Sequence, residues 1–417
     1  MEIVLEIEKI GKLARQASKE LIIIPDVKIS RMLERTSELI LDNKTAVLEA
    51  NALDIKKVSL TEVKKAFVDR LQLNDNRLDD ICKTLKEIAK QKSPVDQVIE
   101  EFHPKNGLRI KKVTTPIGVI GIIFESRPNV FCDAAALCLR SKNASILRPG
   151  SEALRTVKVL HRLMSVAINE LGLPKNCVQL IQGSNREQVR ELIKMTKYVD
   201  VIVPRGGRNL VNLVETEAKV PVFAHLEGIV HIYVHSLASF ETTKKVVLNS
   251  KSRRPGICGA VETIILDKGF YEKHGENLVD FLINDGVEVR ADTTLFKNKL
   301  IKHCKKSDFG FEFLDNILAV KIVNDIEEAI GHIQEFGSEH TDCIITEDKK
   351  ARDIFFKKLN SSILISNAST QFADGGEFGF GAEIGISTGK LHARGPIGAR
   401  HLVSFQYHVE GNGNVRP

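Results

Sequence analysis

Residues 117–124 read IGVIGIIF, a continuous apolar run with the length of one β-strand. Isoleucine, valine and phenylalanine favour extended backbone, and a run without polar positions is typical of a buried strand. Similar β-rich runs follow at residues 145–148, 178–181 and 199–203. Segments with helical spacing separate them at 152–171 and 186–197. Strands that alternate with helices in this way predict parallel βαβ units.

The chain on either side of this region has a different pattern of apolar residues. Apolar residues spaced three and four apart predict helices at 2–24, 27–57 and 75–91. Ser184 and Glu187 predict a capping box at the start of the helix near residue 186. A second α/β region is expected at 230–360, with strands at 229–234, 263–266 and 343–346. Because 417 residues exceed what one core usually supports, two or more domains are expected.

The composition excludes several classes of protein. A net charge of +6 suits a small anionic substrate or cofactor, and the lack of Trp and of basic runs with aromatics argues against a nucleic-acid partner. The first ten residues are acidic where a signal peptide needs positive charge. No apolar stretch approaches the length of a membrane span, so a cytoplasmic location is expected.

Seven cysteines are scattered singly and form no C-x-x-C pair, which argues against a disulfide framework or a structural zinc site. Cys258 stands out, because it lies in the loop KSRRPGICGA at 251–260, where three cations precede the thiol. Positive charge lowers the pKa of a cysteine and favours the nucleophilic thiolate. The alternative is a structural thiol beside a solvated basic loop.

Two further segments have the composition of ligand sites. The run VIVPRGGR at 201–208 predicts a strand that enters a Gly-Gly turn before a helix, where backbone amides can approach phosphate, although such turns also occur without a ligand. The glycines of 379–385 lack the strand-before, helix-after context of a dinucleotide fingerprint. His231, Tyr233 and His235 alternate along one strand, but no carboxylate or thiol at matching spacing favours a metal.

These segments together resemble the aldehyde dehydrogenase superfamily over nearly the whole chain. The matching blocks begin at Thr115, Asp133, Val203, Arg253, Phe336 and Asp374. The last block, DGGEFGFGAEIGISTGKLHARGPIG, is typical of the members that reduce an acyl phosphate. The resemblance implies a Rossmann-type cofactor domain, an α/β catalytic domain and a small β element for oligomerisation.

The resemblance also implies roles for individual residues. Cys258 matches the catalytic cysteine, and Asn129 matches an Asn that stabilises the oxyanion together with the backbone amide of the cysteine. The residues that match cofactor-binding positions are Arg148, Pro149, Ser151, Glu152, Arg205, Gly206, Gly207 and Glu312. Arg127 and Arg254 are candidates to bind the acyl phosphate, because planar Arg suits phosphate, although structural ion pairing is an equal alternative. No metal is expected.

Four positions depart from the superfamily pattern. Gly259 follows the cysteine where Asn is usual, Pro149 replaces a Gly, Asn316 replaces a Pro, and His235 replaces an Asp. None of these departures removes the nucleophile.

The activity implied is NADPH-dependent reduction of L-glutamyl 5-phosphate to L-glutamate 5-semialdehyde and phosphate, through a thioester, in proline biosynthesis. Glutamate 5-kinase is the expected upstream partner. The first alternative is oxidation of a free aldehyde, which needs a general base where His225-Leu226-Glu227-Gly228 stands, with His at the base position. The second is a catalytically silent member that only oligomerises.

Domain roles follow the same resemblance. Residues 1–225 are expected to form the cofactor domain, interrupted by an oligomerisation strand at 103–116. Residues 226–365 are expected to form the catalytic domain, 366–384 an active-site loop region and 385–417 an oligomerisation tail. The residues at 106–115 and at the alternating tail are expected to form strands that associate between subunits of a homo-oligomer. Arg148 is expected to meet the 2′-phosphate of NADPH, or else to pair with Glu152.

Overall fold

The structure is a computed structural model that describes residues 2–58, 65–183, 185–224 and 227–416. The chain divides into two compact units. Unit 1 comprises Met1–Ala224, Gly379–Gly385 and Pro396–Pro417, and unit 2 comprises His225–Phe378 and Ile386–Gly395. The chain therefore returns to unit 1 twice after residue 378. The functional division of the chain into cofactor, catalytic, loop and oligomerisation segments stays a prediction.

Helices form the N-terminal part of unit 1. They are α1 (Glu2–Leu21), α2 (Asp26–Asp42), α3 (Lys44–Val58), α4 (Lys65–Leu71) and α5 (Asp75–Lys90). The single helix expected at 27–57 is wrong, because α2 ends at Asp42 and α3 begins at Lys44. The side chain of Asn43 donates to the carbonyl of Leu39 at 2.9 Å. An Asn side chain that competes with the backbone in this way favours a helix end over a helix interior.

A parallel sheet forms the centre of unit 1, with strand order β5-β4-β3-β6. Its strands are β3 (Val119–Phe124), β4 (Ala144–Pro149), β5 (Val178–Leu180) and β6 (Val201–Arg205). The connecting helices are α6 (Asn129–Arg140), α7 (Leu154–Glu170), α8 (Arg186–Ile193) and α9 (Arg208–Glu217). All residues of β3 and β4 are buried, which confirms the buried strand expected from the apolar run.

Two boundaries in this region differ from the sequence-based expectation. The strand expected at 199–203 is β6, which begins two residues later, at Val201. At Asp200 the carboxylate accepts from Arg15 and from the Val119 amide. Helix α8 begins at Arg186, and the side chain of Asn185 caps it by accepting from the Glu187 amide at 2.9 Å. Ser184, the cap expected from the sequence, lies outside the described residues.

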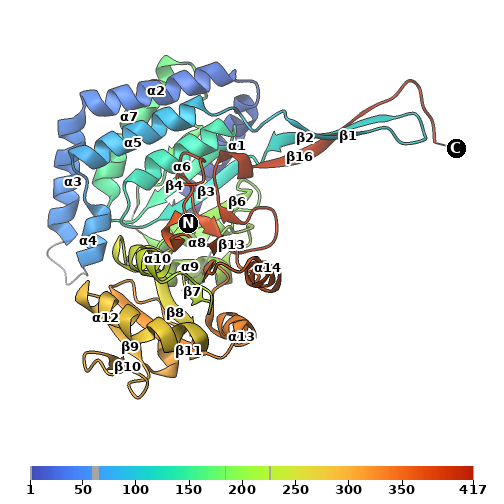
Figure 1. The fold of residues 1–417 in the computed structure, drawn as a ribbon. Helices are drawn as coiled ribbons and strands as arrows, with labels where there is room; N and C mark the ends of the chain where they lie inside the picture. Colours follow the sequence, from blue (N-terminus) through green and yellow to red (C-terminus); the bar gives the residue numbers. More distant parts are fainter. Residues whose placement is uncertain (1, 59–64, 184, 225–226, 417) are drawn as a thin grey trace. The chain divides into compact units, whose positions relative to one another are not determined.

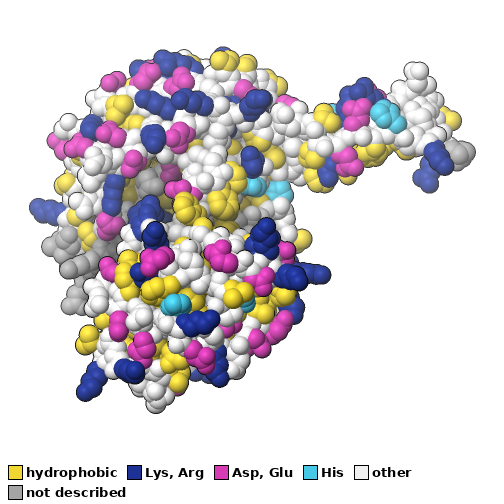
Figure 2. All heavy atoms as spheres, in the orientation of Figure 1, with side chains coloured by type: hydrophobic (Ala, Val, Ile, Leu, Met, Phe, Trp, Pro, Cys, Tyr) yellow, Lys and Arg dark blue, Asp and Glu magenta, His cyan; other side chains and the backbone are white. Residues whose placement is uncertain are grey.

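An arm extends away from the helices and the parallel sheet of unit 1 (Figure 1). It consists of β1 (Val98–Phe102), β2 (Arg109–Pro116) and β16 (Val403–Glu410), and β2 pairs antiparallel with both neighbours. The two segments expected to be strands are therefore strands, and they pair with each other inside the chain. Figure 2 shows hydrophobic side chains along this arm beside charged ones. Those of Phe405, Tyr407 and Val409 are exposed.

Unit 2 contains a second parallel sheet with strand order β10-β9-β11-β8-β7-β12-β13. Its strands are β7 (Val230–Val234), β8 (Val261–Asp267), β9 (Glu288–Ala291), β10 (Lys302–His303), β11 (Ile317–Val323), β12 (Thr341–Ile345) and β13 (Ile363–Ser366). Its α-helices are α10 (Phe240–Ser252), α11 (Lys268–Phe270), α12 (Glu276–Asn284), α13 (Ile326–Phe336) and α14 (Lys349–Lys358). The strands expected near 229–234, 263–266 and 343–346 are present.

Shorter elements complete the chain. They are the π-helix Tyr271–Gly275, the 3₁₀ turns Lys306–Asp308, Thr370–Phe372 and Ala399–His401, and the two-residue strands β14 (Ile386–Ser387) and β15 (Gly395–Pro396). Among the helices of the described residues, none is both long enough and apolar enough to cross a membrane.

Candidate active site

The strand order of unit 1 creates a natural ligand site. The chain runs from β3 outward through β4 to β5, and then returns to place β6 on the other side of β3. In open α/β sheets, ligands bind outside the carboxyl ends of the strands where this reversal occurs. The residues at this point are Glu125, directly after β3, and Gly206, directly after β6. The expected cofactor residues at the ends of β4 and β6 lie at this same edge, whereas Glu312 belongs to unit 2.

The turn after β3 is held by a carboxylate from the neighbouring strand connection. Ser126 has φ of 44°, a left-handed conformation that is uncommon for a residue with a side chain. Its amide donates to Glu152 Oε1 at 2.7 Å. A Cβ on Gly150 would lie 2.5 Å from the carboxyl carbon of Glu152, so the Glu152 side chain would have to move if a larger residue stood there. Glu152 thus links the turns that follow β3 and β4.

The Gly206–Gly207 turn accommodates a second carboxylate. Glu125 Oε2 accepts a hydrogen bond from the Gly207 amide at 2.9 Å. A Cβ on Gly206 would lie 2.5 Å from Glu125 Oε2 and 2.7 Å from Leu210 Cδ2. The turn is therefore a cradle that a side chain would fill, at the N-terminus of α9, where amides favour an anion. This geometry fits the diphosphate of a dinucleotide, with Glu125 as an additional residue that sequence reasoning missed.

Arg148 lies at the end of β4, next to both of these carboxylates. Its side chain is only 8% exposed. Burial lowers the pKa of the Arg148 guanidinium, while Glu152 and Glu125 oppose that shift. The charge of Glu152 favours the charged form of Arg148, and the choice between pairing with Glu152 and a cofactor contact stays a prediction. Ser151 lies half-buried in the turn between them.

Arg205 ends β6 and pairs with Glu383. The distance from Nη2 to Oε1 is 3.4 Å, and both side chains are mostly buried. Glu383 belongs to the glycine-rich stretch 379–385, which forms no strand or helix and so does not form a dinucleotide fingerprint. A Cβ on Gly385 would touch Arg205 Cδ at 3.4 Å, so this stretch packs against the end of β6.

Asn129 is the first residue of α6 and is half-buried. Its side-chain amide donates to Asp133 Oδ2 at 2.9 Å, one turn further along the helix. Sequence reasoning missed this contact, although the spacing of four residues on a helix would have signalled it. Asp133 therefore orients the Asn129 amide, while Arg127 lies half-buried just before the helix. Asn129 and Arg127 belong to unit 1, and Cys258 and Arg254 belong to unit 2.

Cys258 lies in the loop between α10 and β8 and is partly exposed. Two glycines allow the backbone to pack closely around it. A Cβ on Gly228 would overlap the Cys258 carbonyl oxygen and lie 2.7 Å from Cys258 Cα. A Cβ on Gly259 would lie 3.1 Å from the Thr370 carbonyl oxygen, which accounts for Gly in place of the usual Asn.

Glu312 binds the same Gly228 turn. Its Oε1 accepts from the Gly228 amide at 3.0 Å. The sequence predicted Cys258 as the nucleophile and Glu312 as a residue that binds a cofactor ribose. The structure places both residues at the Gly228 turn. Gly228 is the residue that joins them, and the sequence named it only as the end of the segment at the general-base position.

Lys251 does not belong to a solvated basic loop, and that part of the sequence-based interpretation is wrong. Its side chain is fully buried in the last turn of α10, with Nζ 2.6 Å from Glu262 Oε2 on β8. Burial raises the pKa of Glu262 to about 7, opposed by Lys251 and reinforced by the nearby charge of Glu312. Burial likewise lowers the pKa of Lys251. Arg253 donates to Gln371 at 3.2 Å, and Arg254 is exposed.

The other cysteines lie in environments that disfavour thiolate. Burial raises the pKa of Cys177, Cys304 and Cys343 to about 12. It also raises the pKa of Cys132 and Cys138, which are fully buried on α6. Of these thiols, none has the partly exposed glycine-lined position of Cys258 within the described residues.

His231 on β7 and His235 directly after it each have a protein partner at Nδ1, while Nε2 of His231 is buried without a hydrogen-bond partner among the described residues. His231 Nδ1 lies 3.2 Å from Asp342 Oδ1, and His235 Nδ1 lies 2.8 Å from Thr346 Oγ1. Within the part of the chain that the structure describes, no cluster of His, Cys, Asp or Glu is arranged to hold a metal ion. Asn316, another departure from the superfamily pattern, is structural, because its side chain bridges Ser252 and the Gly286 carbonyl oxygen.

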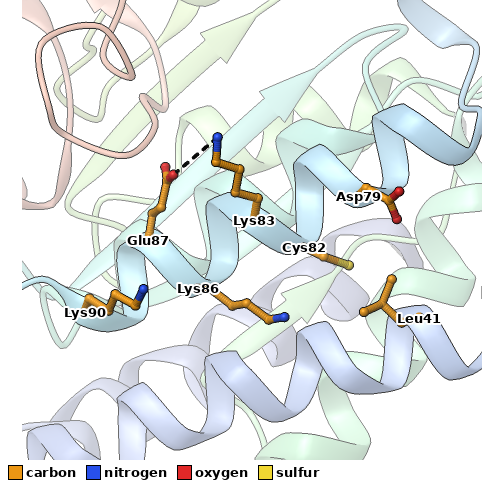
Figure 3. A pocket seen from close by; sticks show the side chains of 7 residues that line it. All are labelled: Leu41, Asp79, Cys82, Lys83, Lys86, Glu87 and Lys90. Atoms are coloured by element: carbon orange, nitrogen blue, oxygen red, sulfur yellow. Dashed lines mark ion pairs between the residues drawn. The ribbon is translucent and has the colours of Figure 1, made fainter.

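A separate cavity of about 420 Å³ lies over α2 and α5 (Figure 3). It is lined by Leu41, Asp79, Cys82, Lys83, Lys86, Glu87 and Lys90. Figure 3 shows Lys83 and Glu87 pointing toward each other one turn apart, with their charged ends 3.9 Å apart. This cavity contains none of the residues assigned to chemistry, and solvated side chains of one helix form most of it.

Comparison with known proteins places this geometry in a family. A model of the aldehyde dehydrogenase family matches residues 5–293. The gamma-glutamyl phosphate reductase of Rhizobium johnstonii is 46% identical over 410 residues, which cover 98% of this chain and 96% of that protein. The crystal structure of gamma-glutamyl phosphate reductase from Thermotoga maritima superposes with a TM-score of 0.94 at 36% identity, covering 99% of this chain and 100% of that one.

A more distant structure shares the fold alone. An engineered glycolyl-CoA reductase with bound NADP⁺ is 17% identical, with a TM-score of 0.71 over 96% of both chains. The chain belongs to the aldehyde dehydrogenase family, and the expected fold class is confirmed. Within that family it is similar, from end to end, to proteins named gamma-glutamyl phosphate reductase.

Proposed function

We propose that this protein reduces L-glutamyl 5-phosphate to L-glutamate 5-semialdehyde and phosphate, the second step of proline biosynthesis. The observation that carries the proposal is the Gly228 turn, which lies against the Cys258 backbone and binds the Glu312 carboxylate. Similarity to gamma-glutamyl phosphate reductases over 98% of the chain supports the choice of substrate.

The Cys258 thiolate attacks the acyl carbon of the substrate, and the carbonyl electron pair moves onto oxygen. Asn129 donates its side-chain amide to this oxyanion, in the orientation that Asp133 sets. The oxyanion collapses, the bond from carbon to phosphate oxygen breaks, and phosphate leaves a thioester on Cys258. Arg127 and Arg254 are the cations proposed to bind the phosphate, because guanidinium groups pair well with its oxygens.

The proposed cofactor is NADPH, which supplies the hydride for reduction of the thioester when bound. Arg148, Pro149, Ser151 and Glu152 form the proposed site for its adenosine ribose, and Arg205, Gly206 and Gly207 the proposed site for its phosphates. Glu312 is proposed to hold the ribose next to the nicotinamide, close to Cys258. After hydride addition, Cys258 leaves as thiolate and the semialdehyde is released.

The test is reduction of NADP⁺ by the semialdehyde, measured with and without inorganic phosphate. Dependence on phosphate is the expected result, because the reverse reaction needs phosphate to cleave the thioester. Turnover without phosphate would favour oxidation of a free aldehyde by a water-activating base. Glu227 lies next to Gly228, and His225, at the base position, lies outside the described residues. If no turnover occurs with or without phosphate, the result favours a catalytically silent member that only oligomerises.

The preference for NADPH is proposed to depend on Arg148. A cation at the end of β4 can meet the 2′-phosphate. In binding titrations, Arg148→Glu should then weaken the binding of NADPH far more than the binding of NADH, because the new carboxylate repels the 2′-phosphate. Equal weakening of the binding of both cofactors would favour the alternative role, in which Arg148 pairs with Glu152.

Three further features are proposed. The protein forms a homo-oligomer through its arm, where exposed apolar side chains lie along β16. Glutamate 5-kinase is its proposed upstream partner, because an acyl phosphate must be made and transferred before it hydrolyses. A cytoplasmic location is proposed because a catalytic thiol stays reduced there.

A further inference from the structure

A carboxylate occupies part of the proposed phosphate site. Glu125 follows β3, and its backbone amide donates to the Arg205 carbonyl oxygen at 2.9 Å, which fixes its place beside β6. Its side chain then reaches the Gly207 amide at 2.9 Å. Gly207 is the N-cap of α9, so this amide belongs to the end of the helix that favours an anion. Glu125 therefore supplies from within the chain the kind of charge that a phosphate would supply.

The shape of the turn matches this carboxylate. A Cβ on Gly206 would lie 2.5 Å from Glu125 Oε2, so a side chain at that position would collide with it. The glycine that makes room for a diphosphate thus also makes room for Glu125. Because one N–H donates one good hydrogen bond, the Gly207 amide cannot serve both acceptors fully.

The charges around Glu125 decide how costly its ionised form is. Helix α9 offers the Gly207 amide, β4 offers Arg148, and α8 offers Arg186, all of which favour the carboxylate. Burial and the neighbouring Glu152 carboxylate oppose them and outweigh them, so the pKa of Glu125 is raised. A carboxylate at a helix N-terminus ordinarily has its pKa lowered, so the environment of Glu125 is unusually unfavourable to a second anion.

We propose that Glu125 controls cofactor affinity by competing with the cofactor diphosphate for the Gly207 amide. The inference rests on the proposed function, in which this turn binds the diphosphate. Binding of the diphosphate is accompanied by uptake of a proton on Glu125, which releases the Gly207 amide. A protonated Glu125 has no charge to repel the diphosphate. Cofactor affinity therefore falls as pH rises through the pKa of Glu125.

The experiment measures the Kd for NADPH by nicotinamide fluorescence from pH 5, near the ordinary carboxyl pKa of 4.5, to pH 9, for the wild type and Glu125→Gln. Gln keeps the shape and removes the charge. We expect about tenfold tighter NADPH binding by Glu125→Gln at the alkaline end, and a smaller pH dependence than in the wild type, because only the NADPH 2′-phosphate then titrates in this range. Glu187→Gln is the matched control, because Glu187 is an exposed carboxylate in the first turn of α8. It should bind like the wild type.

Two measurements keep the outcomes distinct. Calorimetry of the wild type in buffers of different ionisation enthalpy should show proton uptake on NADPH binding, a result that needs no variant to fold. Inorganic pyrophosphate, used as a probe in place of NADPH, should show the same preference for Glu125→Gln. Equal or weaker NADPH binding by a folded Glu125→Gln would overturn the role of Glu125 alone. Failure of the wild type to bind either NADPH or pyrophosphate would overturn the proposed cofactor site as well.

Discussion

Replacement of Gly228 by Ala tests whether the contact between Gly228 and Cys258 sets the position of the nucleophile. The new Cβ would lie 2.7 Å from Cys258 Cα and 2.8 Å from its carbonyl carbon. Carbon atoms prefer separations of about 3.5–4.0 Å, so the two backbone segments must move apart by about 1 Å. Neither neighbour is the flexible end of a side chain, so the strain is not relieved by a rotamer change.

The expected effects separate activity from stability. A misplacement of about 1 Å at a reacting group costs about 10²-fold in rate, and we expect phosphate-dependent turnover to fall by about that factor. Overpacking of this kind costs about 1–3 kcal/mol of unfolding free energy. That loss lowers Tm by about 2–4 °C per kcal/mol for a unit of this size. The assays are NADP⁺ reduction with phosphate and thermal unfolding followed by circular dichroism.

Gly331→Ala provides the matched control. Gly331 is exposed on α13 of the same unit, and a Cβ there would meet no atom within 4 Å. Ala should leave turnover unchanged and stabilise the helix by up to about 1 kcal/mol. If Gly228→Ala retains turnover within threefold of the wild type at an unchanged Tm, the close contact does not position Cys258 and the reasoning is refuted.

Other substitutions have equally definite outcomes. Cys258→Ser should abolish turnover without lowering Tm, and residual activity above one per cent would exclude Cys258 as the nucleophile. Asn129→Ala should lower kcat by about 10²–10³-fold, whereas a loss below threefold would assign it to packing. Lys251→Met should lower the unfolding free energy by about 3–5 kcal/mol, because it leaves Glu262 unpaired. The double variant Lys251→Met with Glu262→Leu should restore most of that loss. Equal Tm values for the single and the double variant would contradict the pairing. Tyr407→Asp should lower the mass measured by light scattering, and an unchanged mass would remove this face of the arm from the interface.

The sequence predicted much of the fold because the signals involved are local. The apolar run of β3 is buried on all its residues, as a parallel strand between two others must be. The alternation in the C-terminal segment also identified β16. The break at Asn43 was missed because Asn is only a weak helix breaker, and its effect depends on a side-chain bond that spacing does not indicate.

The candidate site was only partly accessible from the sequence. Cys258 could be singled out by the Pro and Gly residues and cations before it. Glu125 lies 82 residues from Gly207, and Gly228 lies 84 residues from Glu312, so no periodicity connects either pair. Only the topology of each sheet brings them together.

The sequence by itself determined the parallel α/β class and the candidate nucleophile, because apolar periodicity and glycine placement act over a few residues. Only the tertiary structure decided what each charge does. Lys251 stands seven residues before Cys258 and looks in sequence like a cation that activates the thiol, yet it is buried against Glu262 at 2.6 Å. The effect of a charge depends on its burial and its partner, and both are properties of packing between segments that sequence spacing does not record.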